Sequence, residues 1–238
     1  MKKTLLIIFF LLISQSANAQ VLISLLFGDK LNTGKIEFGL DGGVNLVTLD
    51  GIEQAENMTT WNLGFYFDIK LPHPSWMIHT GVIVKSTLGT ESLPVYSLGN
   101  PDLDAAFSGG NVATRLQYFN VPIMVKYKIK KQFFVEAGPM LGLLYNASDK
   151  FTNTVQESED LQYQLKTKDA YHPLDAGMMV GVGYRLLGGN GMNLGIRYYY
   201  GLVDILIDDS TPGQYNRAWY FSVGIPIGAG KPANEGKK

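Results

Sequence analysis

Two neighbouring segments decide the fold of this chain, YFNVPIMVKY (118–127) and FFVEAGPMLGLL (133–144). One face of the first segment is apolar and is formed by Phe119, Val121, Ile123, Val125 and Tyr127. Asn120, Met124 and Lys126 alternate with these residues, and the second segment repeats the pattern. Because only a short connection around residues 129–131 separates the two segments, the pattern predicts an antiparallel hairpin with a tight turn. Each strand has the length of about 9 to 11 residues that a tilted strand needs to cross a membrane.

The same alternation recurs along the chain, and it predicts eight strands. We expect them at 35–46, 61–71, 76–85, 118–127, 133–144, 174–186, 192–202 and 217–228. The connections between them alternate in length. The long ones are 47–60, 86–112, 145–173 and 203–216, and the short ones are 72–75, Lys130 with its neighbours, and 187–191. This layout is typical of an all-β, eight-stranded, antiparallel up-and-down transmembrane β-barrel with short periplasmic turns and long outer loops.

The N-terminal residues are typical of a secretory signal peptide. Lys2 and Lys3 precede an apolar stretch at 5–13, and Ala17-Asn18-Ala19 supplies a cleavage site, so we predict cleavage after Ala19. The sequence then divides into a signal peptide (1–19), a periplasmic N-terminal segment (20–34), an outer-membrane barrel (35–228) and a polar C-terminal tail (229–238).

Composition excludes several classes of protein. With 20 basic and 21 acidic residues, the chain lacks the positive charge of a nucleic-acid-binding protein. It contains no cysteine, hence no disulfide and no thiolate metal site. After the signal peptide there is no apolar run of about 18 residues, so we expect no transmembrane helix. Low charge combined with 27 glycines and 25 Tyr and Phe residues favours a membrane barrel.

Period-2 alternation alone also fits a soluble lipocalin-like barrel, and two features argue against that alternative. The non-apolar face is rich in Gly, Tyr, Asn and Ser and would be a poor surface for water. Aromatic residues also gather at the strand ends, as membrane interfaces favour. We place Trp61, Tyr198, Tyr200 and Trp219 at the outer end and Trp76, Tyr127, Phe133 and Tyr184 at the periplasmic end.

Three prolines lie inside predicted strands, at Pro122, Pro139 and Pro226. Each removes one hydrogen-bond donor from the ladder, so we expect local bulges at these positions.

Several of these segments carry a resemblance to a known family. The chain resembles small eight-stranded outer-membrane β-barrel domain proteins, often described as porin-family or PorT-like. The similarity lies in 35–46, 116–127, 133–144, 178–186, 196–205 and 221–228, and Tyr-x-x-x-Pro-x-x-x-Lys-Tyr (118–127) is its most specific element. The resemblance implies a monomeric barrel in the outer membrane, and PorT-like members imply a link to protein secretion. The polar tail after the last strand departs from the terminal aromatic residue of typical outer-membrane proteins.

The interior face of the predicted barrel holds many charges. They are Glu37, Asp41, Asp68, Lys70, Lys85, Lys126, Glu136, Asp175, Arg185 and Arg197. An eight-stranded interior is just wide enough for side chains to fill, so these charges should pair across the lumen. As candidate site residues we single out a luminal charge network of Lys126, Glu136, Asp175, Arg185 and Arg197. It either fixes the barrel as a polar core or acts as a gate, in which Glu136 swings away from Lys126 or Arg197 to pass small ions.

An enzyme of lipid chemistry is a further alternative. It would need a nucleophile, a histidine and an acid near one rim, and His172 with Asp175 and a loop serine such as Ser148 is the candidate set. Neither a Gly-x-Ser-x-Gly motif, a phosphate loop nor zinc-ligand spacing accompanies it. We therefore predict no enzymatic activity, no catalytic residues, no cofactor and no metal.

Acidic residues outnumber basic ones in each of the four long connections. We expect a structural or binding role through these outer loops, because loops carry recognition when a scaffold is closed. Expected partners are outer-membrane lipid and lipopolysaccharide, with secretion machinery or extracellular ligands as further options. The alternatives are a narrow, low-conductance porin for small solutes and a PorT-like component associated with protein secretion.

Overall fold

A computed structural model describes residues 34–130, 132–156, 161–186, 191–208 and 212–227. The predicted signal peptide, nearly all of the segment 20–34 and the tail 229–238 lie outside the described residues.

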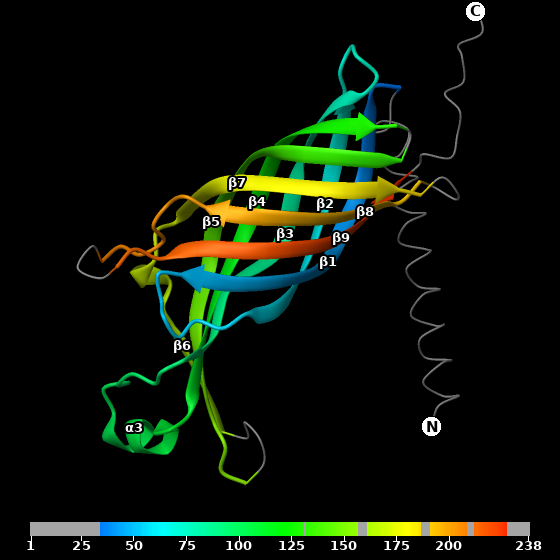
Figure 1. The fold of residues 1–238 in the computed structure, drawn as a ribbon. Coiled ribbons are helices and arrows are strands. Elements are labelled where there is room, and N and C mark those ends of the chain that lie inside the picture. Colours follow the sequence, from blue (N-terminus) through cyan, green and yellow to red (C-terminus); the bar gives the residue numbers. More distant parts are fainter. Residues whose placement is uncertain (1–33, 131, 157–160, 187–190, 209–211, 228–238) are drawn as a thin grey trace, which may run out of the picture.

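In the described part of the chain, nine strands form one antiparallel sheet, and eight of them close into a ring (Figure 1). The ring strands are β1 (Ile36–Asp50), β2 (Met58–Lys70), β3 (Trp76–Leu93), β4 (Asn111–Ile129), β5 (Phe133–Asn153), β7 (Leu174–Arg185), β8 (Asn193–Gly201) and β9 (Tyr215–Pro226). Each pairs with its neighbours along the chain, and the first strand, β1, pairs with the last, β9. Closure leaves the ring with no open edge, which is the condition for a sheet to cross a lipid bilayer.

Short turns join the strands at one end of the barrel, and long connections join them at the other. At the turn end β2, β4 and β7 end and β3, β5 and β8 begin, and at the loop end β1, β3, β5 and β8 end and β2, β4, β7 and β9 begin. The predicted alternation of short and long connections is therefore present.

The outer face of the barrel wall is apolar, whereas the polar and charged side chains of the strands are buried on the inner face. In β4 the outward side chain of Phe119 is 39% exposed, whereas the neighbouring Asn120 is 1% exposed. Ile123 and Val125 are exposed like Phe119, whereas Lys126 is buried like Asn120. An exposed belt of aliphatic and aromatic residues is stable only against lipid, so the polarity of the wall argues for a membrane barrel and against a soluble one.

Aromatic residues pair across neighbouring strands at both ends of the wall. Trp76 and Tyr127 face each other at the turn end with ring centroids 4.8 Å apart. Tyr198 and Trp219 do the same toward the loop end at 4.6 Å. These pairs lie in the two belts that the sequence predicts, at the heights where membrane interfaces favour amphipathic rings.

Three strands extend far past the barrel wall at the loop end, where the sequence analysis placed loops. β3 continues to Leu93, β4 begins at Asn111, and β5 continues to Asn153 and pairs with β6 (Leu161–Lys166). Alternation continues in these extensions, but with fewer apolar residues, and this weaker pattern was not recognised as strand. Figure 1 shows β4 and β5 running past the ring toward β6 and α3.

Helix α3 (Pro101–Phe107) forms the far end of this extension. Asn100 caps its N-terminus by accepting hydrogen bonds from the backbone amides of Asp102 and Leu103, and proline occupies the first turn. Both features are common at helix starts. A short 3₁₀ helix, η2 (Lys168–Ala170), precedes β7. Among the described residues, no helix combines the length and apolarity needed to cross a membrane.

The prediction of bulges at the prolines was wrong. Pro122 lies opposite Met140, and Val125 lies opposite Ala137, so the register of β4 with β5 does not shift between these pairs. Instead, the ladder of β4 with β5 is interrupted between these two pairs, opposite Pro139. Register shifts occur elsewhere, between Leu63 and Gly64 against β3 and between Gln117 and Tyr118 against β5.

Candidate functional site

The lumen toward the turn end is crossed by a closed circuit of polar side chains from five strands. Asp68 Oδ1 lies 2.6 Å from His79 Nδ1, and Lys126 Nζ lies 2.9 Å from Asp68 Oδ2. Lys126 Nζ is also 3.9 Å from Glu136 Oε2, and Arg197 Nε donates to Glu136 Oε1. The guanidinium of Arg197 returns to His79 Nε2 at 3.2 Å and closes the circuit. We call these five residues the luminal ring.

Arg197 is the hub of the luminal ring. Besides its contacts with Glu136 and His79, Arg197 donates through Nη1 to Asp41 Oδ2 at 2.6 Å. Asp41 lies on β1, so this bond adds a sixth strand to the network. Both ring nitrogens of His79 are paired when Nδ1 donates to Asp68 and Nε2 accepts from Arg197. A buried charge is tolerated only with such partners, so the luminal ring ties opposite walls of the barrel together.

Gly181 leaves space for the contact between Arg197 and Glu136. It lies on β7 between Glu136 on β5 and Arg197 on β8 in the register of the sheet. A Cβ atom at this position would lie 2.8 Å from Arg197 Cγ and 3.4 Å from Glu136 Cγ. The missing side chain therefore lets the guanidinium and the carboxylate meet across an intervening strand.

Of the five predicted site residues, three meet in the luminal ring: Lys126, Glu136 and Arg197. Arg185 lies closer to the turn end and forms an ion pair with Glu37 at 2.7 Å. Asp175 lies on the loop side and accepts a hydrogen bond from Asn216 at 2.9 Å. The structure thus divides the predicted network into separate clusters.

Two other charges predicted to face the interior do not. Lys85 turns outward because a bulge in β3 between Ile83 and Ser86 inverts the alternation, and its ammonium group lies 3.6 Å from the Trp61 ring centroid. Lys70 lies at the exposed turn end and donates to the carbonyl of Gly34.

Two residues of the luminal ring, Asp68 and His79, were not singled out as site residues. Both lie on the inward face, and the turn at 71–75 places them directly opposite each other in the hairpin of β2 and β3. Counting outward from that turn would have revealed the pair. The contact of His79 with Arg197 crosses the lumen and carries no such local signal.

Above the luminal ring, toward the loop end, apolar side chains fill much of the lumen, beside buried polar residues such as Asn45, Asn62 and Asn120. This luminal apolar cluster comprises Val47, Leu49, Met58, Ile83, Leu88, Leu116, Tyr118, Met124, Met140, Leu144, Ala147, Tyr171, Met179, Tyr199, Ile205, Ala218 and Tyr220. Two cavities of about 10 Å³ each, lined in part by Asp41, His79 and Arg197, flank the luminal ring. Each has room for about one water molecule.

A second apolar cluster lies outside the barrel and stabilises what we call the loop-end projection, residues 89–115, 148–156 and 161–166. Phe107 of α3, Val112 of β4 and Phe151 of β5 are buried together there. The rings of Phe107 and Phe151 contact edge to face with centroids 5.9 Å apart. Leu93, Val95, Leu98, Leu103, Leu161 and Leu165 pack around them. The projection is therefore a folded body with its own core.

A buried carboxylate joins separate segments of the projection to one another. Asp149 accepts hydrogen bonds from Thr114 Oγ1 and from the Tyr96 hydroxyl, each at 2.7 Å. Burial and the neighbouring Asp149 carboxylate raise the pKa of Tyr96. The hydroxyl therefore stays protonated and keeps donating over the physiological range.

The candidate hydrolytic set is not assembled. His172 is exposed, Asp175 points into the lumen toward Asn216, and Ser148 accepts a hydrogen bond from Gln164. Within the described ranges, no group of three or more acidic or histidine residues is placed to hold a metal ion.

The sequence of this chain matches a known protein family. The profile described as outer membrane protein beta-barrel domain matches residues 14–206, which is most of the chain. The chain belongs to this family. As a member of the outer membrane protein β-barrel domain family, it is an outer-membrane protein, and its ring of eight antiparallel strands is the predicted architecture.

Solved structures of other small outer-membrane proteins are similar in outline. Ail of Yersinia pestis is 11% identical with a TM-score of 0.41, and the match covers 81% of this chain and 99% of Ail. Neisserial surface protein A is 10% identical with a TM-score of 0.42, covering 80% and 96%. OprG of Pseudomonas aeruginosa is 12% identical with a TM-score of 0.32, covering 81% and 93%. No curated protein sequence matches the chain.

Proposed function

We propose that this protein is a non-enzymatic outer-membrane barrel that binds a partner outside the cell through its loop-end projection. The observation that carries the proposal is the contrast between the interior of the barrel and the loop-end projection. The lumen is filled by the luminal ring and the luminal apolar cluster, whereas the projection is an independent folded surface. A barrel with a filled lumen can serve as a scaffold, and partners are then bound by the loops that the scaffold positions.

The filled lumen supports a scaffold over a channel for energetic reasons. Opening the luminal ring would leave a carboxylate or a guanidinium unpaired in a closed interior, and breaking a buried ion pair costs about 3–5 kcal/mol. An ion would then still meet the luminal apolar cluster, where Leu88, Leu116 and Met140 are almost completely buried. Both layers would have to move for solutes to pass.

The projection supports a binding role because it is ordered before a partner arrives. Its core aromatics, the carboxylate of Asp149 and the cap at Asn100 fix its shape. A preorganised surface loses less conformational entropy on binding than a flexible loop. Since acidic residues outnumber basic ones in all four long connections, the complementary partner is a macromolecule that presents basic groups.

The test uses cells of the source organism that lack the gene. They are complemented with the wild-type chain or with a variant in which a four-residue Gly-Ser turn replaces residues 94–110. Attachment of whole cells to a surface coated with a basic protein such as lysozyme is measured. Wild type should restore attachment and the shortened variant should not, with equal amounts of heat-modifiable barrel in both strains. Equal attachment of the two strains contradicts the proposal.

A narrow pore is the second candidate, and the charged luminal ring with its two water-sized cavities is the observation in its favour. Conductance of the refolded barrel in a planar bilayer distinguishes the two functions. If the barrel is a scaffold, we expect no current across the bilayer. Steady and reproducible current steps would instead make the lumen the functional site. The secretion role implied by the PorT-like resemblance stays a prediction, tested by whether deletion traps exported proteins in the periplasm.

A further inference from the structure

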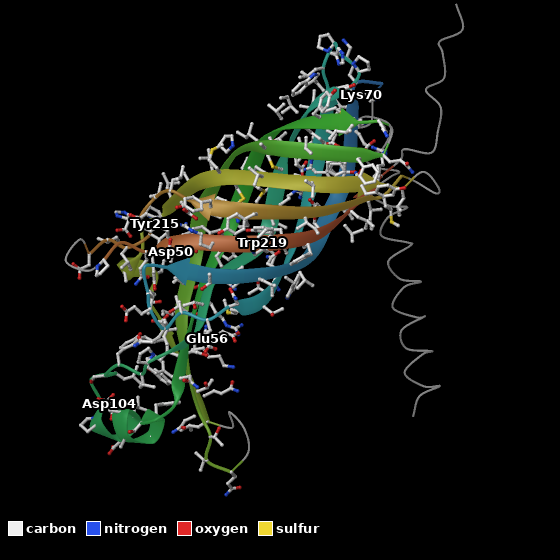
Figure 2. The ribbon with its side chains drawn as sticks, viewed as in Figure 1. Asp50, Glu56, Lys70, Asp104, Tyr215 and Trp219 are labelled. Carbon is white, nitrogen blue, oxygen red and sulfur yellow. The ribbon has the colours of Figure 1, made fainter. Side chains whose placement is uncertain are left out.

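A pocket of about 420 Å³ opens on the outside of the barrel wall at the loop end. It lies over β1 and β9, between the aromatic residues of β8 and the connection that joins β1 to β2. We call it the rim pocket; the residues that matter here are Thr48, Asp50, Asn57, Tyr198, Arg217 and Trp219. Figure 2 shows Asp50 beside Tyr215 at the loop end of this side of the barrel and Trp219 farther along β9.

The register of β1 with β9 explains why the wall is hollow at this point. Leu46 lies opposite Trp219, Thr48 opposite Arg217, and Asp50 opposite Tyr215. All these side chains point outward, because they alternate with luminal Val47, Leu49 and Ala218. Thr48 has the shortest side chain of these residues, so the longer side chains around it form the walls of the pocket.

Arg217 is held as part of the wall. Its Nη1 donates to the carbonyls of Gly201 at 2.8 Å and Asn216 at 3.0 Å, and its Nη2 donates to Asp50 Oδ2 at 2.7 Å. The guanidinium also lies 3.7 Å from the ring centroid of Tyr200. Because both terminal nitrogens are engaged and a carboxylate lies beside them, the pocket is poorly suited to a phosphate or sulfate.

The groups that remain for a ligand are hydrogen-bonding side chains above an aromatic wall. The side chain of Asp50 is 58% exposed although it pairs with Arg217, and Asn57 is exposed at the edge of the pocket. The membrane-facing wall is the Trp219 ring, which is 47% exposed and packs against Tyr198. An aromatic ring beside a carboxylate, an amide and a hydroxyl complements a pyranose, whose CH-rich face stacks on a ring while its hydroxyls bond at the rim.

The height of the pocket identifies the source of such a sugar. Trp219 and Tyr198 belong to the aromatic belt at the loop end, and such belts lie at the level of lipid headgroups. A volume of about 420 Å³ falls within the range of small-ligand sites. We infer that the rim pocket binds the saccharide headgroup of a glycolipid in the outer leaflet. This goes beyond the proposed function, because the pocket lies on the barrel wall and does not involve the projection.

The experiment places the full mature chain, with Trp61→Phe and Trp76→Phe, in phosphatidylcholine nanodiscs. Trp219 is then the sole tryptophan and reports on the pocket. Monoglucosyl diacylglycerol is added at increasing mole fraction, and emission of Trp219 is recorded. The expected result is a saturable change in emission. Thr48→Phe, which fills the floor of the pocket, should weaken the apparent affinity by about tenfold or more, a difference of one decade in the dissociation constant.

Leu143→Phe is the matched control, because it adds an aromatic ring to the outward face of β5, away from the pocket, and should leave the titration unchanged. Native mass spectrometry of the chain with all three tryptophans, with and without Thr48→Phe, measures retained glycolipid even where the reporter variant folds poorly. An equal response to phosphatidylglycerol overturns recognition of a saccharide. An equal response to soluble methyl glucoside overturns the glycolipid source, and the absence of any saturable binding overturns the site.

Discussion

At the scale of single residues, the free energy of unfolding depends on how completely the charges of the luminal ring are paired. Glu136 is buried between Arg197 and Lys126. Glu136→Gln removes the anion and leaves both cations without that partner. Loss of one member of a buried pair costs about 3–5 kcal/mol, so the denaturation midpoint of the heat-modifiable form should fall clearly. The exposed Glu53→Gln should leave the midpoint unchanged.

Glu136→Gln also distinguishes a structural role of the luminal ring from a role as a gate. Because the luminal apolar cluster lies between Glu136 and the loop end, Glu136→Gln should remain silent in a planar bilayer even though it is less stable. Conductance that appears in Glu136→Gln and not in wild type would instead support a gate at Glu136.

The space at Gly181 gives a second prediction at this scale. A methyl group there would press on Arg197 Cγ at 2.8 Å and on a backbone carbonyl at 3.0 Å. Gly181→Ala should therefore destabilise the barrel by about 1–3 kcal/mol, as overpacking of an interior does. Gly195→Ala is the matched control on the neighbouring strand, since the nearest atom to its Cβ is the rotatable Ser222 Oγ at 3.2 Å. Equal losses of stability would contradict this role of Gly181.

At the scale of elements, the projection and the barrel should be separable. Phe151 is completely buried and contacts Phe107, Tyr96 and Tyr163 in the projection. Phe151→Ala removes the centre of that cluster, at a cost of about 3–5 kcal/mol for a buried aromatic. The projection should become sensitive to limited proteolysis, while the heat-modifiable shift of the barrel persists. Phe119→Ala, on the outward wall, should not expose the projection to protease.

The segment before α3 should respond to pH. Asp104 accepts hydrogen bonds from Ser97 Oγ and from the amide of Leu98, and these bonds hold its pKa below the ordinary value for a carboxyl. A lowered pKa in the folded state means that the stabilisation is present above the ordinary pKa and is lost as pH falls through the lowered one. Amide exchange of Leu98, corrected for its intrinsic pH dependence, should lose protection over that acidic window. Asp104→Asn should remove the dependence, and Asp102→Asn should retain it.

At the scale of the whole molecule, the two ends of the barrel should face opposite compartments. The chain contains no cysteine, so single substitutions can be labelled without background. Asp104→Cys, in α3, should react with a membrane-impermeant maleimide on intact cells. Ser75→Cys, in a turn at the other end, should react only after the outer membrane is permeabilised. Labelling of Ser75→Cys on intact cells would reverse the orientation.

Export is a further prediction for the whole chain. Cleavage after Ala19 would give a mature protein that begins at Gln20, and intact-mass measurement of the purified outer-membrane protein checks this. Substituting Ala17 and Ala19 with bulky residues should block processing, because signal peptidase requires small side chains there.

Much of this architecture follows from local pattern. Alternation along each segment predicts which side chains face lipid, and the short turns set the register of each hairpin. Asp68 opposite His79 and Lys126 opposite Glu136 both follow from counting away from a turn. The bulge that turns Lys85 outward and the strand extensions of β3, β4 and β5 were missed, because one extra residue or a weaker alternation leaves little signal in a single sequence.

By itself, the sequence determined the membrane barrel, its strand number, its two aromatic belts and the presence of charges inside it, because these depend on period-2 alternation and connection length. Only the tertiary structure decided which charges meet. Arg197 reaches Asp41 and Glu136 past one intervening strand on either side and His79 across the lumen, and this set of partners depends on the stagger with which eight strands close. The rim pocket likewise depends on pairing of the first strand with the last. Such contacts join residues distant along the chain, so ring closure creates them and no local pattern encodes them.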